Sequence, residues 1–460
     1  MPRPRNIVWI TTDHMRYDCV GANGNPAMHT PNLDALAEGG VRFADCYANN
    51  FVCMPSRCSF MTGCYPEQTG VMQNGQELPD DFPWTAPRVF GAGGYRTVQI
   101  GKLHFQGHED MDLDPRPRNT YGFDVFQLSE EPGCYEDAYR TWLRGEHPEL
   151  VDAFTVPRPM SQDRRKERTQ FQVLDAPWEA SHSGWVATQA CRYLGAWGVR
   201  REPQFMHLGF YAPHPPLNPT REMAAPYEGV ELPELARRED DWNDPGDLPQ
   251  ETLEAYRRHF YAMVTGVDMA VGRVCDELRR IGQLEDTLIV FGSDHGDHCG
   301  DHGRIAKGPT YYESVMHMPW ILHWPNGFPQ GGRRIDGLVE MVDILPTLCE
   351  LAGISPPAAM QGRSYAQSLL SGAPITPRSD VYGTGLGGKI MLRTPERKYL
   401  RYHGDRRNPE VLYDLVQDPG EFRNVAGDAA YADELPALRE RALERVLEAS
   451  SSIRQRRVRF

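Results

Sequence analysis

The sequence lacks three features that would place it in a special class of protein. No stretch approaches the run of about 20 apolar residues that a membrane helix needs. Basic residues are outnumbered, 49 to 63, and the net charge of −14 argues against a general nucleic-acid-binding protein. The ten cysteines form no CxxC pair, which removes the commonest zinc motif and predicts mostly reduced thiols. A globular protein without nucleic-acid or membrane partners is the class that remains.

The N-terminus also lacks the apolar core of a secretory signal. Met1 to Arg5 is polar and leads directly into the apolar run Asn6–Thr11, so a cytoplasmic location is the expectation. At the other end, the basic tail from Arg454 to Arg459 predicts a solvated or docking segment. Such a tail is compatible with contacts between the subunits of a homo-oligomer.

Strand-like and helix-like segments alternate over most of the chain, which predicts an α/β core. The expected strands are Asn6–Thr11, Val41–Tyr47, Tyr95–Ile100, Gln204–Phe210, Asp286–Gly292 and Pro319–Trp324. The expected helices are Thr30–Gly40, Ser181–Trp197, Glu251–Ile281 and Val342–Ala352. Residues 108–178 are rich in Asp, Pro, Arg and Glu without periodicity, and they predict an irregular insertion.

The pattern of predicted strands and helices changes near residue 377. Short alternating strands are expected at Lys389–Arg393, Lys398–His403 and Glu410–Leu415, followed by a charged helix from Glu434 to Ala449. The sequence therefore predicts a large α/β domain over residues 1–376 and a small α+β domain over residues 377–460.

Polar residues follow several of the predicted strands at the point where each strand ends. In open α/β sheets, ligands bind at the carboxyl ends of the strands, so we expect an active site there. The candidate residues are Asp13 and His14 after the first strand, then Lys102 and His104, then His214, and finally Asp294 and His295.

The same residues include possible metal ligands. Asp13 and Asp294 offer carboxylate oxygens, while His14 and His295 offer imidazole nitrogens, a set that favours Ca²⁺, Mg²⁺ or Mn²⁺. Zinc is the alternative because the run from Asp294 to His302 is rich in histidine, although its spacing matches no structural zinc motif. Within that run we expect supporting roles for three residues, Asp297, His298 and Asp301.

Lysine is rare in this chain, which has five lysines against 44 arginines. Two of the five, Lys102 and Lys307, lie in glycine-containing segments close to other candidate residues. A compact ammonium group suits a single oxyanion oxygen, so both lysines are candidates for binding an anion.

Cys53 precedes Pro55 and Arg57 at a predicted helix start. A helix N-terminus attracts anions, and Arg57 lies one turn further on. The alternative is a buried apolar cysteine, and no general base for a simple cysteine nucleophile is evident.

The run from Cys53 to Arg57 resembles the C-x-P-S-R signature of the sulfatase family, within the alkaline phosphatase superfamily, and Thr62-Gly63 extends it. Other segments resemble family motifs in the same order, so that the resemblance covers nearly the whole chain outside residues 108–178. These segments are Thr30–Asp34, Gly101–His104, Pro213-His214, Ser293–Gly296, Lys307-Gly308 and Leu412–Asn424. The resemblance implies an alkaline-phosphatase-like fold, with a large mixed sheet flanked by helices and a smaller C-terminal domain of a short antiparallel sheet and a helix.

The resemblance also implies a chemistry. A maturation enzyme would oxidise Cys53 to formylglycine, an aldehyde that hydrates to a gem-diol. One hydroxyl of the diol would attack sulfur and expel the alcohol, and the other would re-form the aldehyde and release sulfate. Asp13, Asp294 and His295 would hold a divalent metal together with residue 53, and the family's usual metal is Ca²⁺.

Further roles follow from the same resemblance. Arg57, Lys102 and Lys307 would stabilise the sulfate oxygens, and His104 would assist the elimination step. His214 would protonate the leaving oxygen together with Lys307. Asn74, near the expected pocket mouth, is a further candidate for substrate binding, with Lys102, His214 and Lys307.

One position departs from the family pattern. Many members carry paired aspartates where this chain has Asp13-His14, which leaves the ligand role of His14 open. Relatives that hydrolyse phosphonate monoesters and phosphodiesters also lack the second aspartate, but they replace the Lys/His pair that is intact here as Lys102 and His104. Sulfate esters are therefore favoured, with aryl, sugar and alkyl sulfates all open. A phosphonate or phosphodiester hydrolase is one alternative, and an anion-binding protein that never matures is the other.

Overall fold

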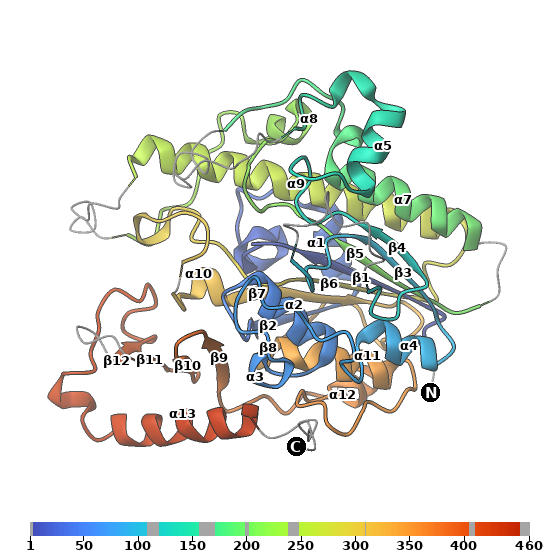
Figure 1. The fold of residues 1–460 in the computed structure, drawn as a ribbon. Coiled ribbons are helices and arrows are strands. Elements are labelled where there is room, and N and C mark those ends of the chain that lie inside the picture. Colours follow the sequence, from blue (N-terminus) through green and yellow to red (C-terminus); the bar gives the residue numbers. More distant parts are fainter. Residues whose placement is uncertain are drawn as a thin grey trace, which may run out of the picture.

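A computed structural model describes residues 3–107, 119–155, 171–197, 202–237, 248–308, 310–403 and 410–450 (Figure 1). The basic tail from Arg454 to Arg459 lies outside these residues. None of the described helices combines the length and the apolar character required to cross a bilayer.

An eight-stranded sheet forms the centre of the molecule, in the order β4-β3-β5-β1-β6-β7-β2-β8. β1 lies between β5 and β6 and runs parallel to both, whereas β7 runs antiparallel to β6 and β2. The sheet is therefore mixed, which confirms the predicted architecture. The strands are β1 Asn6–Thr12, β2 Val41–Tyr47, β3 Arg96–Gly101, β4 Val125–Leu128, β5 Gln204–Gly209, β6 Thr287–Ser293, β7 His317–His323 and β8 Arg333–Glu340.

Helices cover both faces of this sheet (Figure 1). Side chains alternate across a strand, so Val8 and Ile10 of β1 join one apolar cluster while Ile7 and Trp9 join the other. Trp9 packs against Phe60 with ring centroids 5.4 Å apart. The helices are α1 Pro31–Gly39, α2 Cys53–Thr62, α3 Pro66–Thr69, α4 Ala86–Ala92, α5 Ala138–Glu146, α7 His182–Trp197, α8 Arg221–Ala224, α9 Gln250–Arg280, α10 Glu313–Met316, α11 Ile344–Leu351 and α12 Ala366–Ser371.

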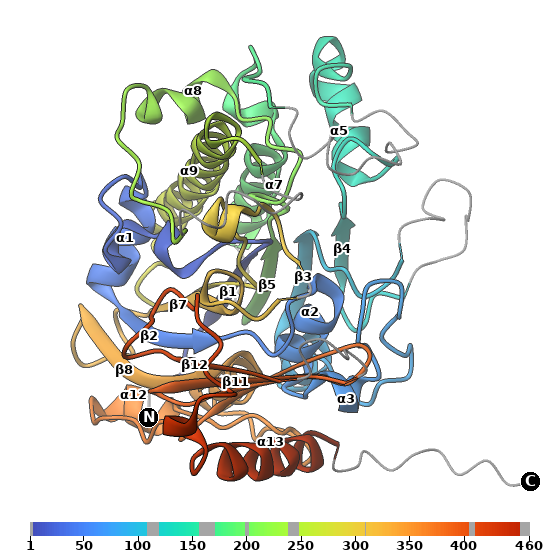
Figure 2. The same cartoon turned by 90° about the vertical axis from the view of Figure 1, so that its left-hand side faces the viewer.

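A second, smaller sheet follows in the C-terminal part of the chain (Figure 2). Its four strands are antiparallel in the order β12-β11-β10-β9, and helix α13 (Leu435–Ser450) packs against it. The strands are β9 Val381–Gly385, β10 Lys389–Arg393, β11 Arg397–Tyr402 and β12 Glu410–Asp414. The small antiparallel sheet with its helix confirms the predicted fold, and the domain boundary at residue 377 stays a prediction.

The prediction of an irregular insertion over residues 108–178 is wrong for part of this range, which contains a strand and a helix. β4 pairs with β3 at the edge of the large sheet, and α5 follows it. β4 was missed because four residues are too few for a visible alternation pattern. Residues 108–118 and 156–170 of the expected insertion lie outside the described residues.

A buried ion network fastens α13 to the large domain. The Arg445 guanidinium donates to Glu340 at 2.6 Å, to Asp380 at 2.9 Å and to the Tyr65 hydroxyl at 2.7 Å. Its side chain is 2% exposed. Because both carboxylates are also buried, removal of the arginine would take one cationic partner from each of them, although Arg441 also pairs with Asp380 at 2.8 Å.

Arg445→Met is therefore expected to lower the free energy of unfolding by about 3 kcal/mol. We place the value at the lower end of the usual range because Arg378 also pairs with Glu340, at 3.2 Å. Arg439→Met is the matched control, since Arg439 lies on the same helix, is 48% exposed and pairs only with Glu410 among the described residues. Its effect should stay within about 1 kcal/mol. Urea denaturation measures the free energy of unfolding of both variants. Equal losses in the two would contradict a special role for the buried Arg445.

Candidate active site

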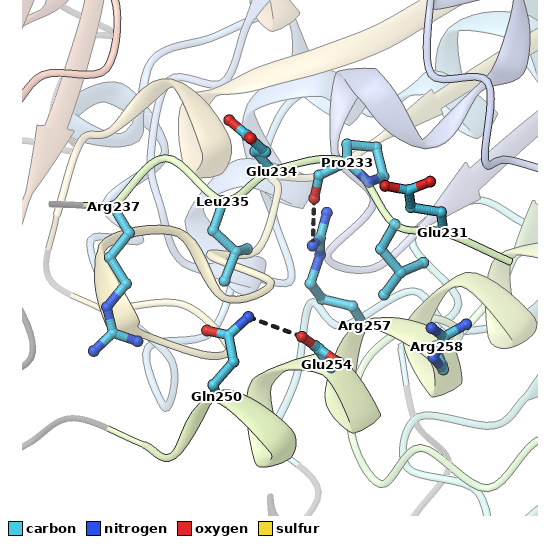
Figure 3. A pocket seen from close by; sticks show the side chains of 10 residues that line it. Glu231, Pro233, Glu234, Leu235, Arg237, Gln250, Glu254, Arg257 and Arg258 are labelled. Carbon is cyan, nitrogen blue, oxygen red and sulfur yellow. Dashed lines mark hydrogen bonds between the residues drawn. The ribbon is translucent and has the colours of Figure 1, made fainter. Parts of the chain in front are cut away.

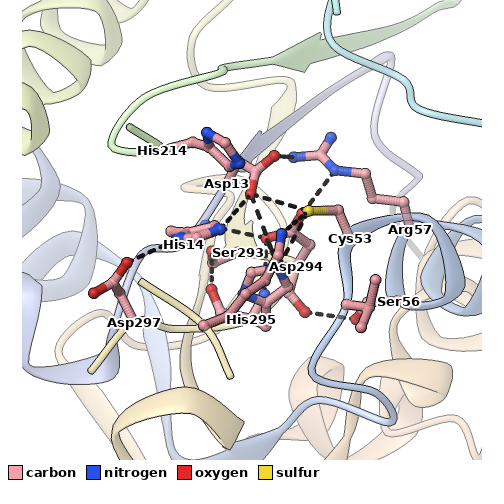
Figure 4. Close-up of polar contacts among 12 residues, drawn as sticks. Asp13, His14, Cys53, Ser56, Arg57, His214, Ser293, Asp294, His295 and Asp297 are labelled. Atoms are coloured by element: carbon pink, nitrogen blue, oxygen red, sulfur yellow. Dashed lines mark hydrogen bonds and ion pairs between the residues drawn. The ribbon is translucent and has the colours of Figure 1, made fainter. Parts of the chain in front are cut away.

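The polar residues that follow β1, β5 and β6 converge around Cys53 at the carboxyl ends of these strands (Figure 4). Lys102, which follows β3, joins them through its ion pair with Asp13. We call this group the Cys53 cluster. Most of its side chains are fully buried, and only His214 and Lys307 are partly exposed. Its members are Asp13, His14, Cys53, Arg57, Lys102, His214, Asp294, His295 and Lys307.

Cys53 is the first residue of α2, as the sequence predicts. All ten residues of this helix are buried. The amide of Met54, in the first helical turn, donates to Asn74 Oδ1 at 3.1 Å, so that an exposed side chain from a loop satisfies a free N–H of the helix start. The predicted contact of Asn74 with substrate stays a prediction.

Asp13 forms ion pairs with two cationic side chains of the cluster. Its Oδ2 lies 2.8 Å from Lys102 Nζ and 3.8 Å from Arg57 Nη2, while Oδ1 faces Cys53 Sγ at 3.5 Å. Burial opposes ionisation of this carboxyl, but the charges of Lys102, His214, Lys307 and Arg57 lower the pKa of Asp13 well below its usual value. The carboxylate is therefore ionised at neutral pH.

Arg57 is fixed by acceptors on three sides. Its Nε donates to Asp294 Oδ2 at 2.8 Å, Nη1 donates to the Lys102 carbonyl at 3.3 Å and Nη2 to the Thr12 carbonyl at 3.1 Å. The guanidinium thus joins α2 to the ends of β1, β3 and β6. It also gives Asp294 a cationic partner, as Lys102 does for Asp13.

The Cys53 thiol contacts both charged and neutral groups. Lys307 Nζ donates to its sulfur, and His295 Nε2 lies 3.4 Å away. Burial, with the charge of Asp13, raises the pKa of this thiol to about 12. An unmodified Cys53 is therefore a protonated thiol at neutral pH, which is a poor nucleophile.

His14 is oriented by a buried carboxylate. Its Nδ1 lies 2.7 Å from Asp297 Oδ2, which also accepts from the Tyr256 hydroxyl at 2.9 Å, and its Nε2 lies 3.7 Å from Asp13 Oδ1. Asp297 thus supports the cluster from outside, as the sequence suggests.

Two overlapping sets of four residues have ligand atoms within 4.8 Å of one another among the described residues. One consists of Asp13, Cys53, Asp294 and His295, the other of Asp13, His14, Cys53 and His214. His14 therefore does not join Asp294 and His295 in one set.

His214 lies against His14, with ring centroids 4.4 Å apart. Its Nδ1 is 2.8 Å from the Tyr211 hydroxyl and 2.6 Å from the Pro215 carbonyl. Burial, followed by the charges of His14 and the nearby lysines, lowers the pKa of His214 well below its ordinary value, and the charge of Asp13 only partly opposes this. The neutral imidazole is therefore the favoured form.

Two glycines direct Lys102 into the cluster. Gly101 and Gly209 are paired in register on β3 and β5, and a Cβ on Gly101 would lie 2.1 Å from the Gly209 carbonyl. This close approach lets the Lys102 amide donate to the Gly209 carbonyl at 2.7 Å, and Lys102 Nζ then lies 4.9 Å from the centre of the Tyr211 ring. The buried His104 follows, with its amide donating to Glu130 at 2.8 Å.

Sequence reasoning missed two aromatic residues at this site. Tyr211 lies two residues after the end of β5 and contacts both Lys102 and His214, so the strand-end argument could have included it. Tyr256 reaches Asp297 from the long helix α9, and no sequence signal links the two.

A cavity of about 510 Å³ lies elsewhere, between the segment from Glu231 to Arg237 and the first turns of α9 (Figure 3). Acidic and basic side chains line it in equal numbers, and Arg257 is held by the Pro233 carbonyl at 2.7 Å. None of its lining residues belongs to the Cys53 cluster. We therefore assign the chemistry to the buried cluster and not to this cavity.

Comparison with known families covers almost the whole chain. The sulfatase family matches residues 5–354, and the family of the N-sulphoglucosamine sulphohydrolase C-terminal region matches residues 300–448. The two matches include every member of the Cys53 cluster and most of the small domain.

Individual relatives agree with this result. The chain is 29% identical to an arylsulfatase of Clostridium perfringens, with 95% of this chain and 93% of the relative aligned. It is 26% identical to an N-acetylglucosamine-6-O-sulfatase of Bacteroides thetaiotaomicron, over 93% and 83% of the two chains. Among solved structures, the phosphonate monoester hydrolase of Agrobacterium radiobacter is similar with a TM-score of 0.82 and 26% identity, over 97% and 96% of the two chains. The chain therefore belongs to the sulfatase family of sulfuric ester hydrolases.

Proposed function

We propose that the protein hydrolyses sulfate monoesters to sulfate and an alcohol, with a nucleophile made by oxidation of Cys53 to formylglycine. The observation that carries the proposal is the setting of Cys53, a buried thiol at a helix start that is contacted by Asp13, His295 and Lys307. With a pKa of about 12 this thiol would stay protonated. Formylglycine would supply a hydrated aldehyde as nucleophile, which requires no thiolate.

The donors around residue 53 fit a divalent cation. Asp13 and Asp294 offer carboxylate oxygens and His295 offers an imidazole, with ligand atoms close enough to share one ion. We propose Ca²⁺, because carboxylate oxygens are hard ligands, while Mg²⁺ and Mn²⁺ use the same donors. When bound, the cation would polarise the sulfate and acidify the nucleophile. His14 belongs to the other set of residues, so its ligand role stays a prediction.

Three cationic side chains around Cys53 fit the sulfate oxygens. We propose that Lys102 and Lys307 contact the anion directly as point charges. Arg57 already donates three hydrogen bonds to protein acceptors, so we propose that it contributes mainly its positive charge and the position of Asp294.

Proton transfer to the leaving oxygen requires a group that is protonated at neutral pH. The neutral form is favoured for His214, so we propose that the Lys307 ammonium donates the proton and that His214 is its hydrogen-bonding neighbour. His104 remains our candidate for assisting sulfate release.

Maturation of Cys53 is the first point to test. Peptide mass spectrometry across residues 53–57, in protein produced with a formylglycine-generating enzyme, should show the aldehyde in place of the thiol. Cys53→Ala should fold normally but lose at least about 10³-fold in turnover, because the nucleophile is gone. Protein that carries only the thiol after such production would instead be an anion-binding protein without this activity.

The second candidate function is hydrolysis of phosphonate monoesters or phosphodiesters, which the similarity to the Agrobacterium structure favours. We expect the sulfate to be the better substrate when kcat/KM is compared for matched para-nitrophenyl esters, because Lys102 and His104 are both present. Efficient cleavage of the phosphodiester, together with an inert sulfate, would reverse this assignment.

The proposed cation gives an independent test. A chelator should abolish hydrolysis, and Ca²⁺ should restore it more fully than Mg²⁺ or Mn²⁺. Asp294→Asn should weaken Ca²⁺ binding by about tenfold or more in calorimetry, since it removes a charged ligand. Unchanged Ca²⁺ affinity in this variant would exclude Asp294 as a ligand.

A further inference from the structure

Lys398 is a buried lysine in the small domain, far in sequence from the Cys53 cluster. It lies on β11 and its side chain is fully buried. Its Nζ contacts the Tyr311 carbonyl at 2.9 Å, Glu313 Oε1 at 2.6 Å and Glu421 Oε1 at 2.5 Å. Two of these three partners belong to the segment that follows Lys307.

Glu421 makes a second connection to the same segment. Its Oε2 accepts from the Glu313 amide at 2.7 Å, at the first residue of α10. Glu421 has a φ of 59°, in the left-handed region that residues other than glycine rarely adopt. Such a conformation is strained and persists where the surroundings fix it. The carboxylate is thus held where it bridges Lys398 and the start of α10.

Aromatic contacts hold the other end of the segment. Phe422, next to Glu421, packs against His302 with ring centroids 5.1 Å apart, and His302 stacks on Tyr312 at 3.8 Å. His302 before Lys307 and Glu313 after it are therefore both in contact with the small domain.

The same segment delivers Lys307 to the cluster. Lys307 Nζ contacts Cys53 Sγ and lies 3.3 Å from His295 Nε2. From the large domain, His298 contacts Thr310 Oγ1 at 3.0 Å and its amide donates to the Ala306 carbonyl at 3.0 Å. The position of the Lys307 ammonium group therefore depends on the contacts that hold the residues before and after it.

We propose that Lys398 and Glu421 are positioning residues that place Lys307, and that the small domain thereby completes the active centre. The inference rests on the proposed function only in that Lys307 acts on the bound ester. There the nucleophile at residue 53 would form a bond to sulfur while the bond between sulfur and the leaving oxygen breaks, and a proton would move from Lys307 Nζ to that oxygen. A displacement of about 1 Å at such a group can cost about 100-fold in rate.

A double-mutant cycle with Lys307→Met and Lys398→Met tests this placement. Para-nitrophenyl sulfate has a good leaving group and needs little protonation, whereas phenyl sulfate has a poor one. Each single variant should lose about tenfold more kcat on phenyl sulfate than on para-nitrophenyl sulfate. In the Lys307→Met background, Lys398→Met should leave this ratio unchanged, because its effect acts through Lys307.

Two further variants separate positioning from stability. Lys389→Met, on the neighbouring strand β10, removes a lysine of the same sheet that contacts Phe51 and lies outside the proposed connection, so the ratio should not change. Glu421→Gln keeps the side-chain shape and replaces the carboxyl group that contacts Lys398, and it should shift the ratio in the direction of Lys398→Met. Equal losses on both esters, or independent effects of Lys307 and Lys398, would overturn the inference.

Failure of the proposed function would give a different result. If both sulfates are inert and a phosphonate ester is cleaved, the same cycle applies to the phenyl and para-nitrophenyl methylphosphonates. If no ester is cleaved, calorimetric titration with inorganic sulfate supplies the readout. Lys398→Met should then weaken sulfate binding in the wild-type background and not in Lys307→Met, and any other pattern would contradict the placement.

Discussion

Charge compensation in a buried space is the constraint on which the active centre depends. Asp13 and Asp294 are removed from water, and each has a cationic partner at 2.8 Å, Lys102 and Arg57 respectively. Ionised groups in such a place cost several kcal/mol each unless partners are close and fixed. The pairing that lets the fold tolerate the buried charge of Asp13 also keeps this carboxylate ionised, which is the state in which it can bind a cation.

The sheet supplies the fixed positions that this pairing needs. The partners come from strand ends that are adjacent only in the folded protein, since β3, β5, β1 and β6 follow one another in the sheet but not in the chain. Arg57 lies on the buried helix α2, and Lys307 lies in a segment that contacts the small domain. Every member of the Cys53 cluster therefore comes from the large domain, and the small domain contacts the segment that carries Lys307.

The sequence predicts the parts of this arrangement that depend on local pattern. The strands at Asn6 and Thr287 are buried on both faces and read as apolar runs, and the polar residues after them mark the site. β8 is not predicted from the sequence because its first half is polar and partly exposed, as edge strands often are, and so lacks an apolar run. Contacts such as His14 with Asp297, or Lys398 with Glu313, join residues whose spacing follows no period. They are set by tertiary packing, which no local pattern encodes.

The burial of α2 limits when the proposed oxidation of Cys53 could take place. Once the chain has folded, Cys53 is only 1% exposed and sits at the head of a helix enclosed on all sides. An enzyme that carries out the proposed oxidation would need access to the Cys53 side chain, which the folded chain encloses. The proposed oxidation and the folding of α2 would therefore compete for the same stretch of chain. The fraction of active protein would be set by their relative rates, and a faster-folding variant would contain less aldehyde while being no less stable.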